Sequence, residues 1–167
     1  GNWIGTDRSG TVDLGNLQAI WTSTVGSAVI GGVGPGTGNV LANSTGPAIE
    51  ITAGDPTITV LGNEIRNSGG LAIDLDSLSS TNVTPNDPGD SDIGANGRQN
   101  FPDAMAAESL AGTVTLDYDL DTSPGQYRLE VYANSGGAHS SGHGEGEQLV
   151  FVDTVNHPGG TAAYTAT

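Results

Sequence analysis

Four side chains between Asn86 and Asn100 have the composition of a cation-binding loop. The stretch reads "NDPGDSDIGANGRQN" and supplies side-chain oxygens from Asp87, Asp90, Asp92 and Asn96. Calcium takes about six to eight oxygen ligands from flexible loops, and the glycines between these residues allow backbone carbonyls to turn inward. We therefore predict that these four residues hold a structural calcium ion, which the acids of "AIDLD", Asp74 and Asp76, could approach.

An Asx-turn linker is the alternative interpretation of the same stretch. Asp and Asn side chains often accept hydrogen bonds from backbone amides two residues further on, and such a loop needs no metal. The spacing is not that of an EF-hand, because counting from Asp90 puts Phe101 where that loop carries a bidentate Glu. Residues 96–102 are expected to cap the apolar end of the preceding structure, with Phe101 over it.

Catalytic chemistry has weaker support in the sequence. Arg66 with Asp74 and Asp76 is the one basic and acidic combination that could serve a lyase or an epimerase, but such a group is also a common surface ion pair. The "GHG" at 142–144 resembles a motif of polygalacturonases, whose other acidic and basic motifs are missing here. We predict no catalytic residues, and we expect the three histidines to lie in solvated loops: His139, His143 and His157.

The two tryptophans are candidate ligand-binding residues. Trp3 and Trp21 are the only indoles in the chain. Indole rings exposed side by side can stack on sugars, whereas buried rings would only fill the core. Both interpretations stay open at this point.

The charge excludes one class of partner. The chain has 4 basic and 19 acidic residues, for a net charge of -15, and such a field repels the phosphates of nucleic acids. No apolar run is long enough to cross a bilayer. There are no cysteines, so disulfides and thiolate metal sites are excluded.

A repeat organises the first half. "NVLANSTGPAIEI" (39–51) aligns with "NEIRNSGGLAIDL" (63–75) at a spacing of 24 residues, and "GVGPGT" in the first copy is an insertion. Short runs such as "VLA", "AIEI", "TITV" and "EIR" alternate apolar and polar side chains, as strands do. Stacked units of this length bury a continuous apolar column. Asn39 and Asn63 are predicted to stack at equivalent turns of parallel strands.

These runs resemble a known family. "GNWIGTDRSGTVDLGN", "IGGVGPGTGNVLANS", "NSGGLAIDL" and "TPNDPGDSDIGANGRQNFP" are similar to the right-handed parallel β-helix repeats of bacterial cell-surface and secreted proteins. The resemblance implies an extracellular or cell-surface location, with an export signal upstream of "GNWIGTD". Family members include lyases, epimerases, hydrolases, adhesins and stalks, so the fold alone does not assign a function.

The second half has a different residue pattern, without the repeat of the first half. "AMAAESLAG" is compatible with a helical turn, whereas "GTVTLDYDL", "QYRLEVYAN", "EQLVFVDTV" and "GTAAYTAT" alternate like strands. They predict a small antiparallel β-sandwich. Its expected inner face carries seven apolar and aromatic residues: Tyr118, Tyr127, Leu129, Val131, Leu149, Phe151 and Tyr164.

The predicted fold is therefore all-β, a short right-handed parallel β-helix followed by a small antiparallel β-sandwich. We expect β-helix coils over 1–85, the Asp/Asn/Gly-rich junction over 86–102 and the sandwich, incomplete in strand number, over 103–167. The predicted function is that of an extracellular structural or adhesive protein stabilised by calcium. The alternative is a carbohydrate-active β-helix enzyme or a carbohydrate-binding module that takes a polysaccharide.

Open strand edges predict self-association. The chain begins inside a repeat and ends inside a strand, and unpaired edges are templates for pairing with another chain. Two explanations remain open, a fragment of a longer protein or a subunit that joins its copies head to tail.

Overall fold

The computed structural model describes residues 1–23, 26–52, 57–75, 83–136 and 141–167. Over these residues the protein is all-β, with one short 3-10 turn, η2 (Ala95–Arg98), between a first half of parallel strands and a second half of antiparallel strands. No helix among the described residues is long and apolar enough to cross a membrane.

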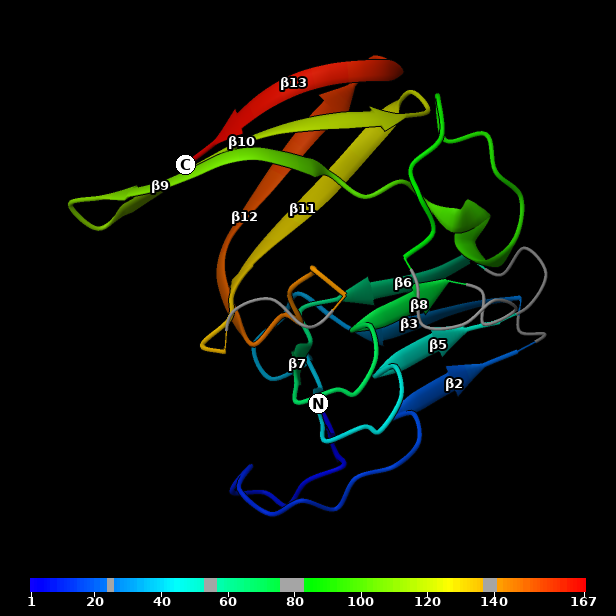
Figure 1. Cartoon of the computed structure of the whole chain (residues 1–167), viewed down its shortest axis with the longest axis vertical. Coiled ribbons are helices and arrows are strands. Elements are labelled where there is room, and N and C mark those ends of the chain that lie inside the picture. Colours follow the sequence, from blue (N-terminus) through cyan, green and yellow to red (C-terminus); the bar gives the residue numbers. More distant parts are fainter. Residues whose placement is uncertain (24–25, 53–56, 76–82, 137–140) are drawn as a thin grey trace.

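The first half passes in turn through three parallel sheets (Figure 1). One contains β1 (Trp3–Ile4), β4 (Val40–Ala42) and β7 (Glu64–Arg66), and a second contains β2 (Ile20–Thr22), β5 (Ile49–Ile51) and β8 (Ile73–Leu75). The third pairs β3 (Ser27–Gly31) with β6 (Thr57–Leu61).

The registers of these sheets follow the sequence repeat. Val40 pairs with Glu64 and Ile49 pairs with Ile73, both at the predicted spacing of 24 residues. Ser27 pairs with Thr57, thirty residues on, because the insertion "GVGPGT" lengthens the first copy by six residues. The parallel pairing predicted from the repeat is thus confirmed in these strands.

An apolar core runs between the three sheets. Leu41, Ile49 and Ile51 have no exposed surface, and Ile58 and Ile65 are almost as buried. Each sits at an alternate position of a short strand, so the side chains of successive strands stack in one column. Truncating one such residue to alanine costs about 2–5 kcal/mol, which makes the column the main stabilising feature of this half.

Buried asparagines connect successive strands at one turn. The Oδ1 of Asn63 accepts hydrogen bonds from the backbone N–H (3.0 Å) and the side-chain amide (2.9 Å) of Asn39. The Oδ1 of Asn39 accepts the N–H of Asn2 at 2.9 Å, and Asn63 Nδ2 donates to the Ile30 carbonyl at 3.0 Å. The predicted contact between Asn39 and Asn63 is confirmed.

The second half forms two antiparallel sheets. β10 (Thr113–Thr122) lies between β9 (Asp103–Leu110) and β13 (Gly160–Ala166), while β11 (Gly125–Ala133) pairs with β12 (Gln148–His157). Tyr118 is 1% exposed and stacks on Tyr164 with ring centroids 5.4 Å apart. Five of the seven predicted inner-face residues belong to this cluster, and Val131 and Leu149 lie outside it.

The expected helical turn in "AMAAESLAG" is wrong. Residues 103–110 form β9, which pairs along its length with β10. The turn between them, Ala111 and Gly112, has positive φ at both residues (52° and 86°), as a two-residue hairpin requires. Pairing with β10 in this hairpin stabilises the strand more than the helical propensity of Ala, Met, Glu and Leu favours a helix.

Candidate functional site

Among the described residues, several polar contacts between distant segments lie where the second half meets the last parallel strands. The N–H groups of Gly62, Ile65, Asn67 and Ser68 lie at the outer edge of β6 and β7. Gly146 O accepts from Ile65 at 3.0 Å, and the carboxylate of Glu145 accepts from Asn67 (2.8 Å) and Ser68. Acceptors from the second half therefore satisfy donors that would otherwise form an open strand edge. We call this contact the joint.

The loop before β12 is shaped to present these acceptors. Asn134 Oδ1 accepts the N–H groups of Glu145, Gly146 and Glu147 at 3.2, 2.9 and 3.3 Å. Gly146 has a φ of 110°, a conformation that ordinary side chains rarely adopt. One asparagine thus fixes the "EGE" backbone with the Glu145 side chain directed at β7.

Glu130 of β11 is the second acidic residue of the joint. Its carboxylate accepts from Gly62 N–H at 2.8 Å, Tyr132 O–H at 2.7 Å and Arg128 Nε at 2.8 Å. Burial alone would raise the pKa of Glu130, but the bonds from Gly62, Tyr132 and Arg128 outweigh it and lower this pKa below its usual value. Burial and the hydrogen bond to Glu130 raise the pKa of Tyr132.

The lowered pKa of Glu130 predicts a pH-dependent joint. A carboxylate whose pKa is lower in the folded state stabilises the fold above its unfolded pKa, and this stabilisation is lost as pH falls through the folded pKa. We expect Glu130→Gln to lose less stability than the wild type between pH 6 and about pH 3, as measured by urea unfolding. Glu108→Gln, at an exposed position of β9, is the matched control and should follow the wild-type pH profile. Identical profiles for all three proteins would contradict the role of Glu130.

The junction loop is held by its own side chains. The amide of Asn86 exchanges two hydrogen bonds with the backbone of Phe101, at 2.9 and 3.0 Å. Asn100 is 3% exposed, and its Nδ2 donates to the carbonyls of Asp87 and Asp121, both at 2.7 Å. The loop is thereby attached to the end of β10.

The four predicted calcium ligands are not brought together as a cluster. Asp87 accepts hydrogen bonds from Ser91, and Asp90 accepts from Asn100 N–H and Thr122 Oγ1, both at 2.8 Å. Asn96 faces β6, and among the described residues no group of three or more acidic or histidine side chains is arranged to hold a metal ion. Asp76 lies outside the described residues. The side chains of Asp87 and Asp90 thus accept from backbone amides four and ten residues further on, not two as in an Asx-turn. The calcium site stays a prediction.

Calcium addition tests that prediction directly. A ligand that binds only the folded state at 100 times its dissociation constant stabilises it by about 2.7 kcal/mol. The prediction is therefore a rise of several degrees in melting temperature between excess chelator and millimolar Ca²⁺, which Asp92→Asn should abolish. An unchanged melting temperature would mean that hydrogen bonds alone hold the loop.

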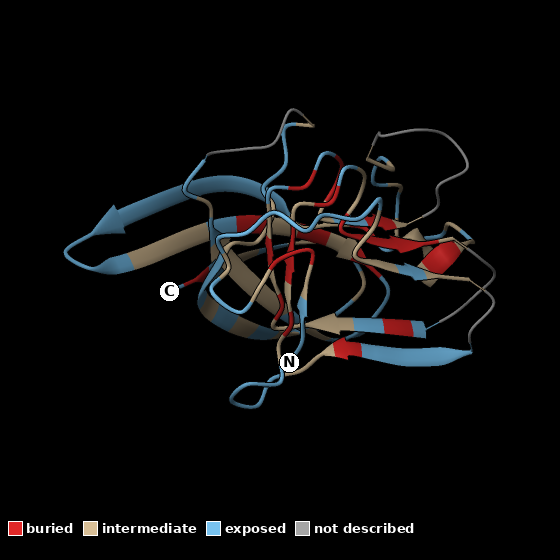
Figure 2. Cartoon of the chain, turned by 90° about the horizontal axis from the view of Figure 1, so that it is seen from below, coloured by how far each residue is buried: buried red, intermediate tan, exposed pale blue. Residues whose placement is uncertain are grey.

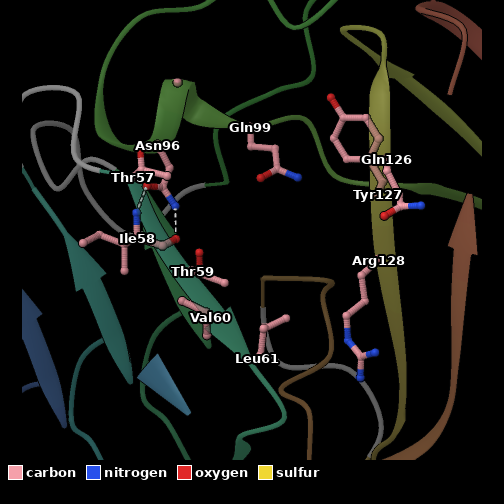
Figure 3. Close-up of a pocket in the computed structure, with 11 residues that line it drawn as sticks. Thr57, Ile58, Thr59, Val60, Leu61, Asn96, Gln99, Gln126, Tyr127 and Arg128 are labelled. Carbon is pink, nitrogen blue, oxygen red and sulfur yellow. Dashed lines mark hydrogen bonds between the residues drawn. The ribbon is translucent and has the colours of Figure 1, made fainter. Parts of the chain in front are cut away.

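A cleft opens between β6 and β11, with a volume of about 520 Å³ (Figure 3). Alternate residues of β6 turn their backbone groups toward it. The side-chain amide of Asn96 accepts a hydrogen bond from the Ile58 N–H at 2.8 Å and donates one to the Ile58 carbonyl at 2.7 Å. The carboxylate of Glu130 accepts the N–H of Gly62, just after β6. Val60 lies between them, and the lining includes five further polar side chains: Thr57, Thr59, Gln99, Gln126 and Arg128.

A second cavity, of about 570 Å³, lies at the end of the apolar column. Ile65 of β7 and Leu71, which precedes β8, line it from the first half, and Phe101 and Tyr132 line it from the other side. Phe101 also contacts His143 edge to face, with ring centroids 5.3 Å apart. Phe101 thus lines a cavity next to the column but is not among the residues packed against its core, to which the neighbouring Ala95 belongs.

The remaining candidates are dispersed. Trp3 on β1 and Trp21 on β2 are 45% and 59% exposed but lie in two different sheets. Arg66 binds Glu64 and the Gly10 carbonyl, so it is held in a structural contact.

The expectation that all histidines lie in solvated loops is wrong for His157. This residue ends β12, is 4% exposed, and bonds to Tyr164 Oη and the Gly160 carbonyl, both at 2.8 Å. A buried ring with a partner for each nitrogen packs against the aromatic cluster and is part of the core. His143 is exposed, and His139 lies outside the described residues.

Sequence reasoning did not identify Glu130, Glu145 or Asn134. The clustered "GHGEGE" is the only local signal for the loop, and nothing near Glu130 indicates that it reaches Gly62. Comparisons of this chain with protein-family models, with curated proteins and with solved structures found no match.

Proposed function

We propose that this chain is a structural module of an extracellular or cell-surface protein. In this proposal the first half is a short right-handed parallel β-helix, and the second half is a small β-sandwich that closes its open edge. The observation that carries the proposal is the joint, because Glu130, Glu145 and Gly146 together accept four backbone N–H groups from β6 and β7 and their flanking turns. Both acidic side chains of the joint therefore bind backbone N–H groups, as a structural connection between the two halves requires.

Adhesion and self-association are part of the same proposal. A chain with a net charge of -15 and no cysteine suits an environment in which salt screens its self-repulsion. Calcium at the junction would fit that environment and would stiffen the connection between the two halves.

A polysaccharide screen tests the structural role against the enzymatic alternative. The protein, with millimolar calcium, is incubated with neutral and acidic polysaccharides, and unsaturated or newly reducing ends are measured. We expect no product above that of a heat-denatured sample. Product that accumulates with time and enzyme concentration would overturn the proposal.

Glycan binding is the second candidate function, and one observation favours it. Trp21, Glu50 and Asp74 are cross-strand neighbours in one row on β2, β5 and β8. The indole of Trp21 is 59% exposed, whereas Glu50 and Asp74 are buried, at 6% and 8%. Gln18 donates to Glu50 beside this row. The exposed face of the indole, and not the buried carboxylates, is therefore the surface that can stack on a sugar ring.

Tryptophan fluorescence during titration with neutral and acidic oligosaccharides tests this candidate. Binding should change the emission of the wild type and of Trp3→Phe but not that of Trp21→Phe. An unchanged emission of the wild type across the whole panel would exclude the Trp21 row as a glycan site.

A further inference from the structure

β9 is the outer strand of the sheet β13-β10-β9, and all eight of its residues are exposed. With β10 it forms a hairpin that projects away from the rest of the molecule (Figures 1 and 2). Met105 and Leu110 on this strand are 65% and 78% exposed. A long exposed edge of this kind is a template for pairing with another strand.

The hairpin turn decides which backbone groups of β9 face the open edge. Leu110 and Thr113 flank the two-residue turn, so they form a hydrogen-bonded pair, and the pairs along the strands then alternate. Ser109, opposite Val114, and Ala107, opposite Leu116, are non-hydrogen-bonded positions. Their N–H and C=O groups therefore point outward, away from β10.

The open edge is straight over a short segment. The register shifts between Asp117 and Tyr118, so Met105 has no partner on β10 and forms a bulge. Such bulges twist an edge and limit pairing beyond them. Residues 106–110 remain regular, and Glu108 is the one charged side chain among them.

This segment is complementary to a second copy of itself. When two β9 strands run antiparallel about Ala107, the outward groups of Ala107 meet those of its counterpart. Glu108 then stands opposite Ala106 of the other copy, and the regular pairing covers residues 106–108 of each copy, because Ser109 and Leu110 meet the segment distorted by the bulge. No carboxylate faces another carboxylate, which matters in a chain with a net charge of -15. A register centred on Ser109 would instead place Glu108 opposite Leu110 and run directly into the hairpin turn at Ala111.

We propose that the outer edge of β9 is a homodimer interface, in which two copies pair antiparallel about a twofold axis at Ala107. This inference rests on the self-associating structural role proposed above and names the edge and register that perform it. One strand pair buries little surface, so the dimer is weak and concentration-dependent. Salt should strengthen it by screening the repulsion between two acidic chains.

Disulfide trapping tests the register. The chain has no cysteine, so Ala107→Cys introduces one thiol, which the twofold axis brings next to its counterpart. Paired residues at such positions lie about 5.5 Å apart at Cα, within the range that a disulfide spans. Ala106→Cys is the matched control, because its two thiols are offset along the strands. In a glutathione redox buffer at high salt, Ala107→Cys should form covalent dimer at least tenfold faster than Ala106→Cys.

Sedimentation velocity over a concentration series tests the dimer without cysteine. The wild type should shift from monomer toward dimer, whereas Ala107→Pro should stay monomeric, because proline removes an outward N–H that β10 does not use. If Ala107→Pro loses its circular dichroism spectrum, Ser109→Pro replaces it on the same argument. A wild type that stays monomeric at every concentration and salt would overturn the proposal. If the wild type dimerises but Ala107→Cys and Ala106→Cys cross-link at equal rates, the proposed pairing of β9 about Ala107 is wrong. The dimer would then form through another strand edge.

Discussion

Replacing Asn63 by alanine is expected to lower the free energy of unfolding by about 3 kcal/mol, since each buried polar group left without a partner costs roughly 1–3 kcal/mol. Asn63 is 4% exposed, and its side chain bonds to the Asn39 N–H, to the Asn39 amide and to the Ile30 carbonyl. Alanine would leave these groups buried with no water to replace the lost bonds. Urea unfolding followed by circular dichroism measures the loss.

Asn2→Ala is the control for this experiment. Asn2 occupies the equivalent turn one strand earlier, but it is exposed, and within the described part of the chain its side chain bonds only to Asn39. The expected loss is under 1 kcal/mol. Equal effects of the two substitutions would contradict the account of Asn63 as the buried connection between neighbouring turns.

Glu145→Ala is expected to lower the free energy of unfolding by about 2 kcal/mol, a typical value for hydrogen bonds to a charged group. The substitution removes both acceptors for Asn67 and Ser68 N–H. Because these bonds connect the two halves, the variant should also unfold less cooperatively, with a broader or double transition in calorimetry.

Glu108→Ala is the control for the charge change, because Glu108 is exposed on β9. At a protein concentration low enough to keep the chain monomeric, it should leave both the midpoint and the width of the transition unchanged. A single transition of wild-type width for Glu145→Ala would mean that the two halves do not depend on this contact.

The parallel strands could be predicted from the sequence because their signals are local and repeated. Val40 and Glu64 fall at the same place in two copies of one pattern. Aligning the two copies therefore predicts that these residues pair in neighbouring strands. The same holds for Asn39 and Asn63. The insertion "GVGPGT" does not disturb this, because it lies between strands.

β9 could not be predicted because its residues favour a helix in isolation. Ala104, Met105 and Glu108 have high helical propensity, and only pairing with β10 makes them a strand. The 103–110 segment contains no alternation of apolar and polar residues, since both of its faces are exposed.

The joint could not be predicted because its partners are far apart in sequence. Glu130 lies 68 residues from Gly62, and Glu145 lies 78 residues from Asn67. The predicted calcium ligands could not be assigned from the sequence for a similar reason. A calcium-binding loop and a loop held by Asp and Asn hydrogen bonds have the same composition. Asp87 and Asp90 accept hydrogen bonds from Ser91, Asn100 and Thr122, and their spacing does not indicate which partner they take.

Amide hydrogen exchange at the edge of β7 tests the central claim, that the second half closes the open edge of the parallel strands. The N–H groups of Ile65, Asn67 and Ser68 are measured by NMR in the wild type and in Glu145→Ala. We predict that all three exchange slowly in the wild type, and that Asn67 and Ser68 exchange at least tenfold faster in the variant while Ile65, bonded to the Gly146 carbonyl, changes less. Exchange of these amides in the wild type at the rate of an unstructured chain would contradict the account.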